Sequence, residues 1–300
     1  LQSEYVVTDL MPLRGNMSNL LPLLSLIDTY FSELKTKFGW GRNALYSLSG
    51  SLSIHPTFIQ EMISNPNYDN AEILSLLNRL GKGGGESFSR SLMDEQIDNF
   101  CPPESTNWIP RVEINSREVL LIAPGPSIHK YQSEIVNYIS KSKPFVISLN
   151  FHRTIPEPLI DARVISHPLR AATEMQDISV GATIVSPLAE EQVNSMSRSE
   201  SFRIFSSVVS RSGFSFYENH SEIPNSLAIS YALGICGSGQ TPRILMAGFD
   251  GFSSDDPRRR DVDHVLKLFS ENTHSPQITS VTPTLYDMPT TSIFLLNSEN

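Results

Sequence analysis

The first hundred residues carry apolar side chains at three- and four-residue spacings, the period of an amphipathic helix. Helices are expected over 19–39, from Pro56 onward, over 69–80 and near 89–100. Gly39 predicts the end of the first, and the glycine-rich segment 81–85 predicts the end of the third. Pro56 suits a first helical turn. These patterns predict an all-α region over residues 1–100.

The pattern changes after a proline-containing segment, 101–112, which we interpret as a linker. Seven short apolar runs follow, at 118–123, 144–150, 162–167, 182–187, 202–207, 243–250 and 292–297. Runs of this length suit strands that are buried on both faces of a mostly parallel sheet. The apolar helix candidate 225–239 precedes the sixth run, as a crossover helix does. Residues 113–300 therefore read as a Rossmann-like α/β domain with helices on both faces.

Composition narrows the function classes. The net charge of −9 excludes a general nucleic-acid-binding role, which needs a basic face. No apolar run is long enough to span a membrane. The two cysteines, Cys101 and Cys236, fit a reducing compartment, and we expect a cytoplasmic protein. The chain begins at Leu1 without a methionine, so we expect it to be part of a longer polypeptide.

Candidate chemistry lies just after the strands, because open parallel sheets bind ligands beyond their carboxyl ends. Gly125 allows close approach to the main chain, and Ser127 is placed to cap a helix whose N–H groups favour an anion. Asn150 offers both donors and an acceptor, with an ordinary turn as the alternative. Asp250 suits ribose hydroxyls, a metal or an amine as its ligand, with a cap on the next segment as the alternative. His167 is either a ligand contact or a loop histidine. No histidine or cysteine pair has metal-ligand spacing, so no metal site is predicted.

These loops, in their order, resemble a Rossmann-like superfamily. The stretches "VLLIAPGPSIHKY", "FVISLNFHRT", "ARVISHPL" and "IPNSLAISYALGICGSGQTPRILMAGFDGF" carry the resemblance. The superfamily includes bacterial sialyltransferases that use CMP-sugars, Maf-type flagellin glycosyltransferases and MptE-like pterin pyrophosphokinases. The resemblance runs from Glu118 to the C-terminus.

The resemblance implies a set of site residues. Gly125, Pro126 and Ser127 would line the nucleotide phosphates, and Asn150 would contact the nucleotide or its sugar. The donor would also meet four further residues: His167, Asn225, Ser226 and Asp250. The sialyltransferases carry tyrosines after the G-x-D motif, and this chain does not. The predicted catalytic residues are therefore Arg258 and Arg259, which would stabilise the leaving phosphate, and His264 as the base.

The N-terminal region carries a second resemblance. "KFGWGRNALYSLSGSLSIHPTFIQEMI" is similar to the helical region that follows the barrel in DRE-TIM aldolases of the 4-hydroxy-2-oxovalerate aldolase-like group. The aspartate and H-x-H metal pair of that barrel are not in this sequence. The resemblance implies an aldolase barrel upstream in the same polypeptide, and lyase chemistry cannot reside in these residues.

Three functions stay open from the sequence. The first is a glycosyltransferase-like domain that takes a CMP-activated acidic sugar as donor and a carbohydrate acceptor, in bacterial surface polysaccharide biosynthesis. The second is an MptE-like pyrophosphokinase, which moves diphosphate from ATP to a pterin alcohol and needs Mg²⁺. The third is a non-catalytic nucleotide-binding or scaffold module.

Overall fold

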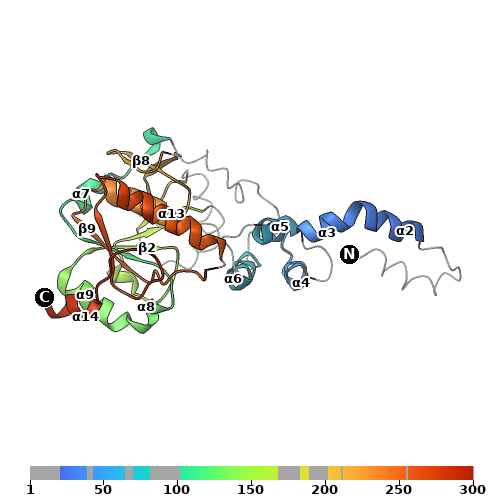
Figure 1. The fold of residues 1–300 in the computed structure, drawn as a ribbon, viewed down its shortest axis with the longest axis horizontal. Coiled ribbons are helices and arrows are strands. Elements are labelled where there is room, and N and C mark those ends of the chain that lie inside the picture. The colour runs from blue at the N-terminus through green and yellow to red at the C-terminus, as the bar shows by residue number, and fades with distance from the viewer. Residues whose placement is uncertain are drawn as a thin grey trace. The chain divides into compact units, whose positions relative to one another are not determined.

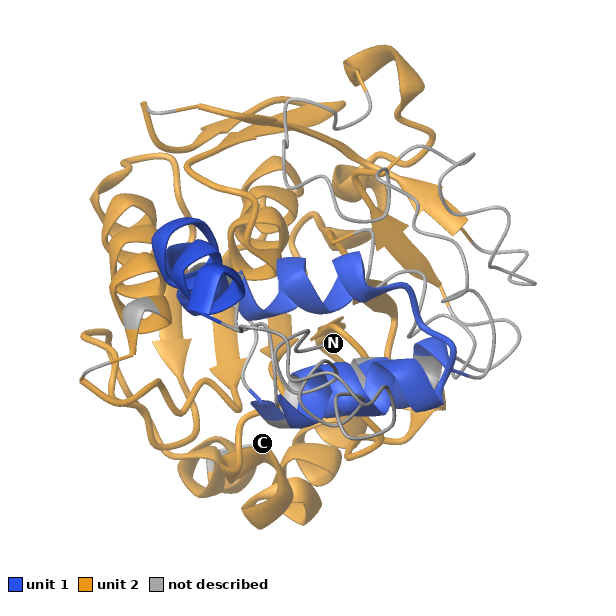
Figure 2. Cartoon of the chain, turned by 90° about the vertical axis from the view of Figure 1, so that its right-hand side faces the viewer, with its two compact units in different colours: residues 1–89 blue, residues 90–300 orange. Residues whose placement is uncertain are grey.

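A computed structural model of the chain describes residues 21–38, 43–64, 70–81, 102–167, 183–188, 202–210, 212–254 and 256–299. The chain forms two compact units, residues 1–89 and 90–300, coloured separately in Figure 2. Each unit is described by itself.

The described part of the first unit is helical, as the sequence predicts. A continuous helix runs through α2 (Leu21–Leu26), the π-helical turn η1 (Ile27–Phe31) and α3 (Ser32–Phe38) (Figure 1). It is followed by α4 (Ala44–Ser51), α5 (Pro56–Ser64) and α6 (Asn70–Leu80). The sequence analysis did not single out α4, which begins after Asn43, whose side chain caps it. Phe58, Ile59 and Met62 of α5 and Leu77 of α6 are buried. The helix expected near 89–100 lies outside the described residues.

The second unit contains a parallel seven-stranded sheet in the order β10-β9-β1-β2-β3-β4-β5. Its strands are β1 (Val119–Ile122), β2 (Phe145–Leu149), β3 (Ala162–Val164), β4 (Ile184–Ser186), β5 (Phe202–Ile204), β9 (Arg243–Ala247) and β10 (Gln277–Ser280). Every pairing within this sheet is parallel. The predicted Rossmann-like α/β fold is confirmed.

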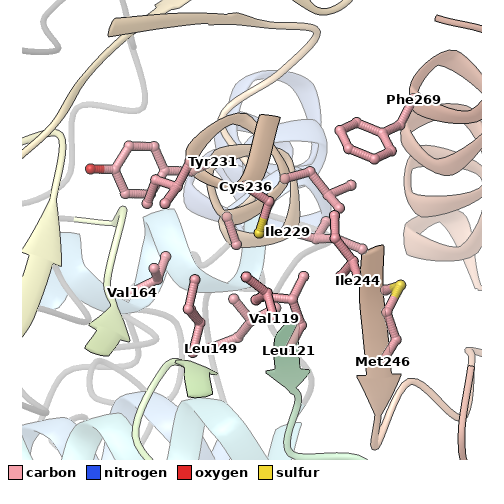
Figure 3. Packing of buried hydrophobic residues seen from close by; sticks show 14 of the residues in the cluster. Val119, Leu121, Leu149, Val164, Ile229, Tyr231, Cys236, Ile244, Met246 and Phe269 are labelled. Atoms are coloured by element: carbon pink, nitrogen blue, oxygen red, sulfur yellow. The ribbon is translucent and has the colours of Figure 1, made fainter. Parts of the chain in front are cut away.

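Successive residues of each strand point to opposite sides of the sheet. Because both sides carry apolar side chains, helices cover both faces. Val119 and Leu121 of β1 pack on the face covered by α7 (Pro110–Ile114), α12 (Ala228–Ser238) and α13 (Pro257–Glu271). Figure 3 shows these two side chains with Ile229 and Cys236 of α12 above them. Leu120 and Ile122 pack on the other face, against α8 (Ser127–Lys130), α9 (Gln132–Ser142) and α14 (Ile293–Glu299).

A smaller sheet lies beside α12, and the single strand predicted over 202–207 is split between the two sheets. The sheet has the order β6-β8-β7, from β6 (Ser206–Val209), β7 (Ser215–Phe216) and β8 (His220–Ile223). The apolar run 202–207 was expected to form one strand. Instead β5 and β6 belong to different sheets, and the Phe205 side chain between them is fully buried.

The strand predicted over 292–297 is wrong, because this segment forms the helix α14. Ser292 caps it by accepting a hydrogen bond from the Phe294 N–H at 3.3 Å. Ile293 and Leu296 are buried while Phe294 and Leu295 are exposed, which is a helical spacing. The strand β10 lies instead at 277–280, in a mostly polar stretch whose pattern predicts no strand.

The described part of the segment interpreted as a linker packs within the second unit. Pro103–Ser105 form the 3₁₀ turn η4, and Trp108 belongs to the core beside Phe205, with ring centroids 6.4 Å apart. The Asn107 side chain accepts a hydrogen bond from the Ile204 N–H at 2.7 Å. Pro110 begins α7. No helix among the described residues combines the length and the apolar character that crossing a bilayer requires.

Candidate functional site at the carboxyl edge of the sheet

The strand order places a switch point between β1 and β9. From β1 the strands run outward through β2 to β5 on one side, and β9 and β10 lie on the other. In open α/β sheets the crevice beyond the carboxyl ends at such a point is where ligands bind. The loops that leave β1 and β9 contain Gly125, Ser127 and Asp250, three of the predicted site residues.

The structure brings Ser127 and Asp250 into direct contact. The Ser127 N–H lies 3.0 and 3.2 Å from the two carboxylate oxygens of Asp250, and Ser127 Oγ donates to Oδ2 at 2.7 Å. The Asp250 carboxylate therefore lies at the start of α8, where Ser127 was expected to cap. A phosphate at this point would have to displace Asp250 from both donors.

Gly125 is required here by close packing. Its N–H donates to the Gly248 carbonyl at 3.0 Å. A Cβ at position 125 would overlap both that carbonyl and the Asp250 carboxylate. Gly248 itself has a φ of 77°, in the left-handed region that favours glycine. The main chain at Gly125 is thus approached by Asp250 of the neighbouring loop.

Asp250 also joins the loop that follows β10. Its carbonyl accepts a hydrogen bond from the Leu285 N–H at 2.8 Å. Nearby, the Gly248 N–H donates to Thr282 Oγ1 at 3.0 Å. One residue therefore links the loops after β1, β9 and β10. Pro126 precedes α8, and its side chain is exposed.

Asn150 directly follows β2 and has a φ of 56°, a left-handed conformation that asparagine tolerates. Its N–H donates to the Val164 carbonyl at 3.0 Å, and its own carbonyl accepts from Arg163 Nη1 at 3.2 Å. The Asn150 carboxamide is half-buried and makes no hydrogen bond to another described residue. Its donors and acceptor are therefore open to a ligand.

A buried polar network lies behind Asn150. The Arg163 side chain is 1% exposed and forms a double ion pair with Glu157, at 2.8 Å from Nε and 2.5 Å from Nη2. Arg163 Nη1 also donates to Ser148 Oγ at 3.1 Å, and Ser148 Oγ lies 3.0 Å from His152 Nε2. The second ring nitrogen of His152, Nδ1, is buried without a hydrogen-bond partner among the described residues.

His152 is held in its neutral form. Burial, together with the positive charges of Arg163 and His129, lowers the pKa of its imidazole from 6.5 to about 4. Glu157 acts in the opposite direction. At neutral pH this histidine therefore offers one donor and one acceptor and no charge.

Asn225 and Ser226 lie beside the end of β3. The Ser226 carbonyl accepts a hydrogen bond from Ser166 Oγ at 3.3 Å, so the start of α12 meets the residue before His167. Asn225 Oδ1 accepts from Ser230 Oγ at 2.6 Å and from the Leu227 N–H at 3.2 Å. Asn225 thus organises the beginning of α12, and His167 is half-buried at the same edge.

The three predicted catalytic residues lie on α13. Arg258 pairs with Asp256, the N-cap of this helix, at 2.6 Å and stacks over Phe252 at 4.2 Å. Arg259 lies 3.6 Å from the Asp263 carboxylate and donates to the Leu285 carbonyl at 3.1 Å. His264 is exposed, about two turns beyond the start of the helix. The structure gives no contact that joins His264 to the loops after β1 and β2.

Sequence reasoning missed the network of Arg163, Glu157 and His152. A signal was present, because Arg163 interrupts an apolar run that otherwise reads as a strand buried on both faces. A buried arginine requires a partner, and Glu157 stands six residues before it. The position of His152 shortly after the second strand can be read from the sequence, but its burial cannot.

Among the described residues there is no group of three or more histidine, cysteine, aspartate or glutamate side chains that could hold a metal ion. No protein-family model matches this chain, and a search of curated proteins finds no match.

Proposed function

We propose that the second unit binds a nucleotide at the carboxyl edge of its seven-stranded sheet and acts as a nucleotide-sugar-dependent glycosyltransferase. The observation that carries this proposal is the convergence of Gly125, Ser127 and Asp250 at the switch point between β1 and β9. Asn150 lies after the next strand with an uncommitted carboxamide. The combination supports recognition of a polar, hydroxyl-rich ligand.

Asp250 favours the sugar over the phosphate as the group that binds beside it. Its carboxylate accepts hydrogen bonds from Ser127, and ribose hydroxyls would donate to the remaining lone pairs. A phosphate next to the same carboxylate would be repelled. The leaving phosphate then needs a cation, and Arg258 and Arg259 at the start of α13, after the Asp250 loop, are the candidates.

The proposed donor is a CMP-activated acidic sugar and the acceptor a carbohydrate, as in bacterial surface polysaccharide biosynthesis, with the chain fused to an aldolase-like module. These specifics rest on the sequence resemblance. The acceptor hydroxyl, deprotonated by a base, attacks the anomeric carbon, and the C–O bond to the nucleotide phosphate breaks as CMP leaves.

Transfer is tested with CMP-N-acetylneuraminate as the donor and lactose as the acceptor, by following CMP release. We expect release that depends on acceptor and falls at least about tenfold in Arg258→Met. His264→Ala, if His264 is the base, abolishes acceptor-dependent release and leaves CMP binding intact. Release that is absent from the wild-type chain with any acceptor, while CMP still binds, would reject the transferase.

A non-catalytic nucleotide-binding module is the second candidate, and three observations favour it. The donors of Ser127 are already occupied by Asp250, and Arg258 is already paired with Asp256. His264 is exposed on α13, and the structure gives no contact between it and the loops after β1 and β2. Binding without turnover in the assay above is the result that this candidate predicts.

A further inference from the structure

The loop that follows β2 is built around one guanidinium group. Arg163 lies in β3, and its planar fork reaches the carbonyls of Asn150 at 3.2 Å and His152 at 3.4 Å. The ring of Phe151, between these two residues, lies 5.2 Å from the guanidinium carbon. Three successive residues of the loop are therefore held by the same buried side chain.

The backbone of Asn150 is fixed by this arrangement. Asparagine tolerates the left-handed region better than most non-glycine residues, and the hydrogen bonds around Asn150 select this conformation from those open to it. Here the carbonyl of Asn150 is held by Arg163 Nη1 and by Ser148 Oγ, at 3.2 and 3.3 Å. Its N–H is held by Val164, the neighbour of Arg163 in β3. The direction in which the Asn150 side chain leaves the backbone is thus set from β3.

Glu157 completes the arrangement. It accepts two hydrogen bonds from Arg163, which leaves the other guanidinium donors directed at the loop. A buried ion pair contributes little net stability, because the cost of removing both charges from water offsets their attraction. The role of the Arg163–Glu157 pair is therefore better inferred from the geometry that it imposes on the loop than from its contribution to stability.

We propose that Arg163 is the positioning residue of the nucleotide site, and that it holds the loop after β2 so that the Asn150 carboxamide faces the bound nucleotide. This inference rests on the proposed nucleotide-binding function. Arg163 itself is too deeply buried to touch the ligand, so it acts through Asn150.

The test uses the whole chain and a double substitution, Arg163→Met with Glu157→Gln, which removes both charges and so leaves neither partner buried alone. The matched control is Arg203→Met with Glu113→Gln. Arg203 pairs with Glu113 at 2.5 Å on the same sheet but in a more exposed position, with its guanidinium carbon 5.6 Å from the centre of the Trp108 ring. Titration calorimetry with CMP is performed on each, beside far-UV circular dichroism.

We expect the Arg163 double variant to keep its circular dichroism spectrum and to bind CMP about tenfold more weakly, roughly the effect of one lost hydrogen bond. The Arg203 control should bind CMP as the wild type does. If the double variant does not fold, Arg163→Lys replaces it. That change keeps the charge but lacks the fork that reaches both the glutamate and the loop.

If Arg163 acts by positioning Asn150, the effects of changing the two residues should not be additive. Asn150→Ala should weaken CMP binding in the control background and have no further effect in the Arg163 background, because Arg163 acts through Asn150. Equal CMP affinity in the Arg163 variant and the wild type would overturn the inference and leave the proposed function standing. So would a full Asn150→Ala effect in both backgrounds. Failure of the wild-type chain to bind CMP would remove the proposed function, and this inference with it.

Discussion

Asp250 combines two tasks at one position. Its carboxylate holds the beginning of α8 through Ser127, and its carbonyl holds the loop after β10 through Leu285. A side chain with this many internal partners supports the fold whether or not a ligand is present. Any contact between Asp250 and a nucleotide therefore uses the part of the carboxylate that Ser127 leaves free.

Gly125→Ala tests how tightly these loops approach each other. The added methyl group overlaps the Gly248 carbonyl, which is backbone and cannot rotate away, as well as the Asp250 carboxylate. We expect a loss of about 2 kcal/mol or more in the free energy of unfolding, measured by urea denaturation. Gly50→Ala is the control, because nothing lies within 4 Å of its Cβ and alanine favours the helix α4. A neutral Gly125→Ala would contradict the close approach.

His152 predicts an acid-sensitive contribution to stability. Its folded pKa of about 4 lies below its ordinary value of 6.5, so the unfolded chain binds a proton that the folded chain refuses. This contribution is complete above pH 6.5 and is lost as the pH falls from 6.5 to about 4. Its full size is about 3 kcal/mol.

Comparison with His152→Gln isolates that contribution, because glutamine retains a polar group near Ser148 and does not titrate. We expect the wild type to lose more unfolding free energy than the variant between pH 7 and pH 4.5, by urea denaturation at each pH. Parallel pH profiles for the two proteins would show that His152 is not buried in its neutral form.

At the scale of elements, α14 illustrates where a sequence pattern is ambiguous. An apolar run of six residues fits a buried strand and a buried helix equally well. What decides between them is whether alternate residues or residues three apart are buried. The buried pair in the structure is Ile293 and Leu296, which belongs to the core cluster shared by β1, β9 and α9.

Leu295→Ala and Leu296→Ala form a matched pair for this element. Leu296 is 8% exposed and Leu295 is 52% exposed. Leu296→Ala should cost about 2–3 kcal/mol of unfolding free energy, and Leu295→Ala should stay within about 0.5 kcal/mol. A strand at this position would reverse the order, because Leu295 would share the face of the buried Ile293.

The central strands were predictable because their apolar runs are bounded by turn residues and buried on both faces. β1, β2, β3 and β9 all lie within the expected ranges. The strands β7, β8 and β10 could not be predicted, because their serine, glutamate and glutamine residues interrupt any apolar run. Their conformation is set by neighbours in the sheet.

Only part of the candidate site can be predicted from the sequence, as with the strands. Residues that directly follow predicted strands, such as Asn150 and Asp250, can be placed at the carboxyl edge from the sequence. The contact between Asp250 and Ser127 spans a separation of 123 residues, and the ion pair of Arg163 with Glu157 depends on the course of a loop. Neither leaves a local pattern, so only the structure supplies them.

For the whole molecule, the division into units differs from the boundary that the sequence indicates. The segment 101–112 reads as a linker because of its prolines, yet Trp108 lies in the core of the second unit. Thr106 Oγ1 accepts a hydrogen bond from the Ser206 N–H at 3.0 Å, and Ser206 Oγ donates to the Pro102 carbonyl at 2.7 Å. The segment is hydrogen-bonded to β5 and β6, the edge strands of the two sheets.

Two fragments test this division. Residues 90–300 should fold with a cooperative thermal transition, whereas residues 113–300 lose Trp108 and the partners of β5 and β6. We expect the shorter fragment to be less stable by several kcal/mol or insoluble, since it exposes core surface. Equal melting temperatures by circular dichroism would show that 101–112 is a linker after all.

A nucleotide site at the carboxyl edge is tested by calorimetric titration of CMP into the whole chain and into Asn150→Ala, with Leu295→Ala as a remote control. We expect one-to-one binding by the wild type and the control, with a Kd of roughly 1 μM to 1 mM. Asn150→Ala should bind about tenfold more weakly. Absence of binding by the wild type, or equal binding by all three proteins, would contradict a nucleotide site at the carboxyl edge of this sheet.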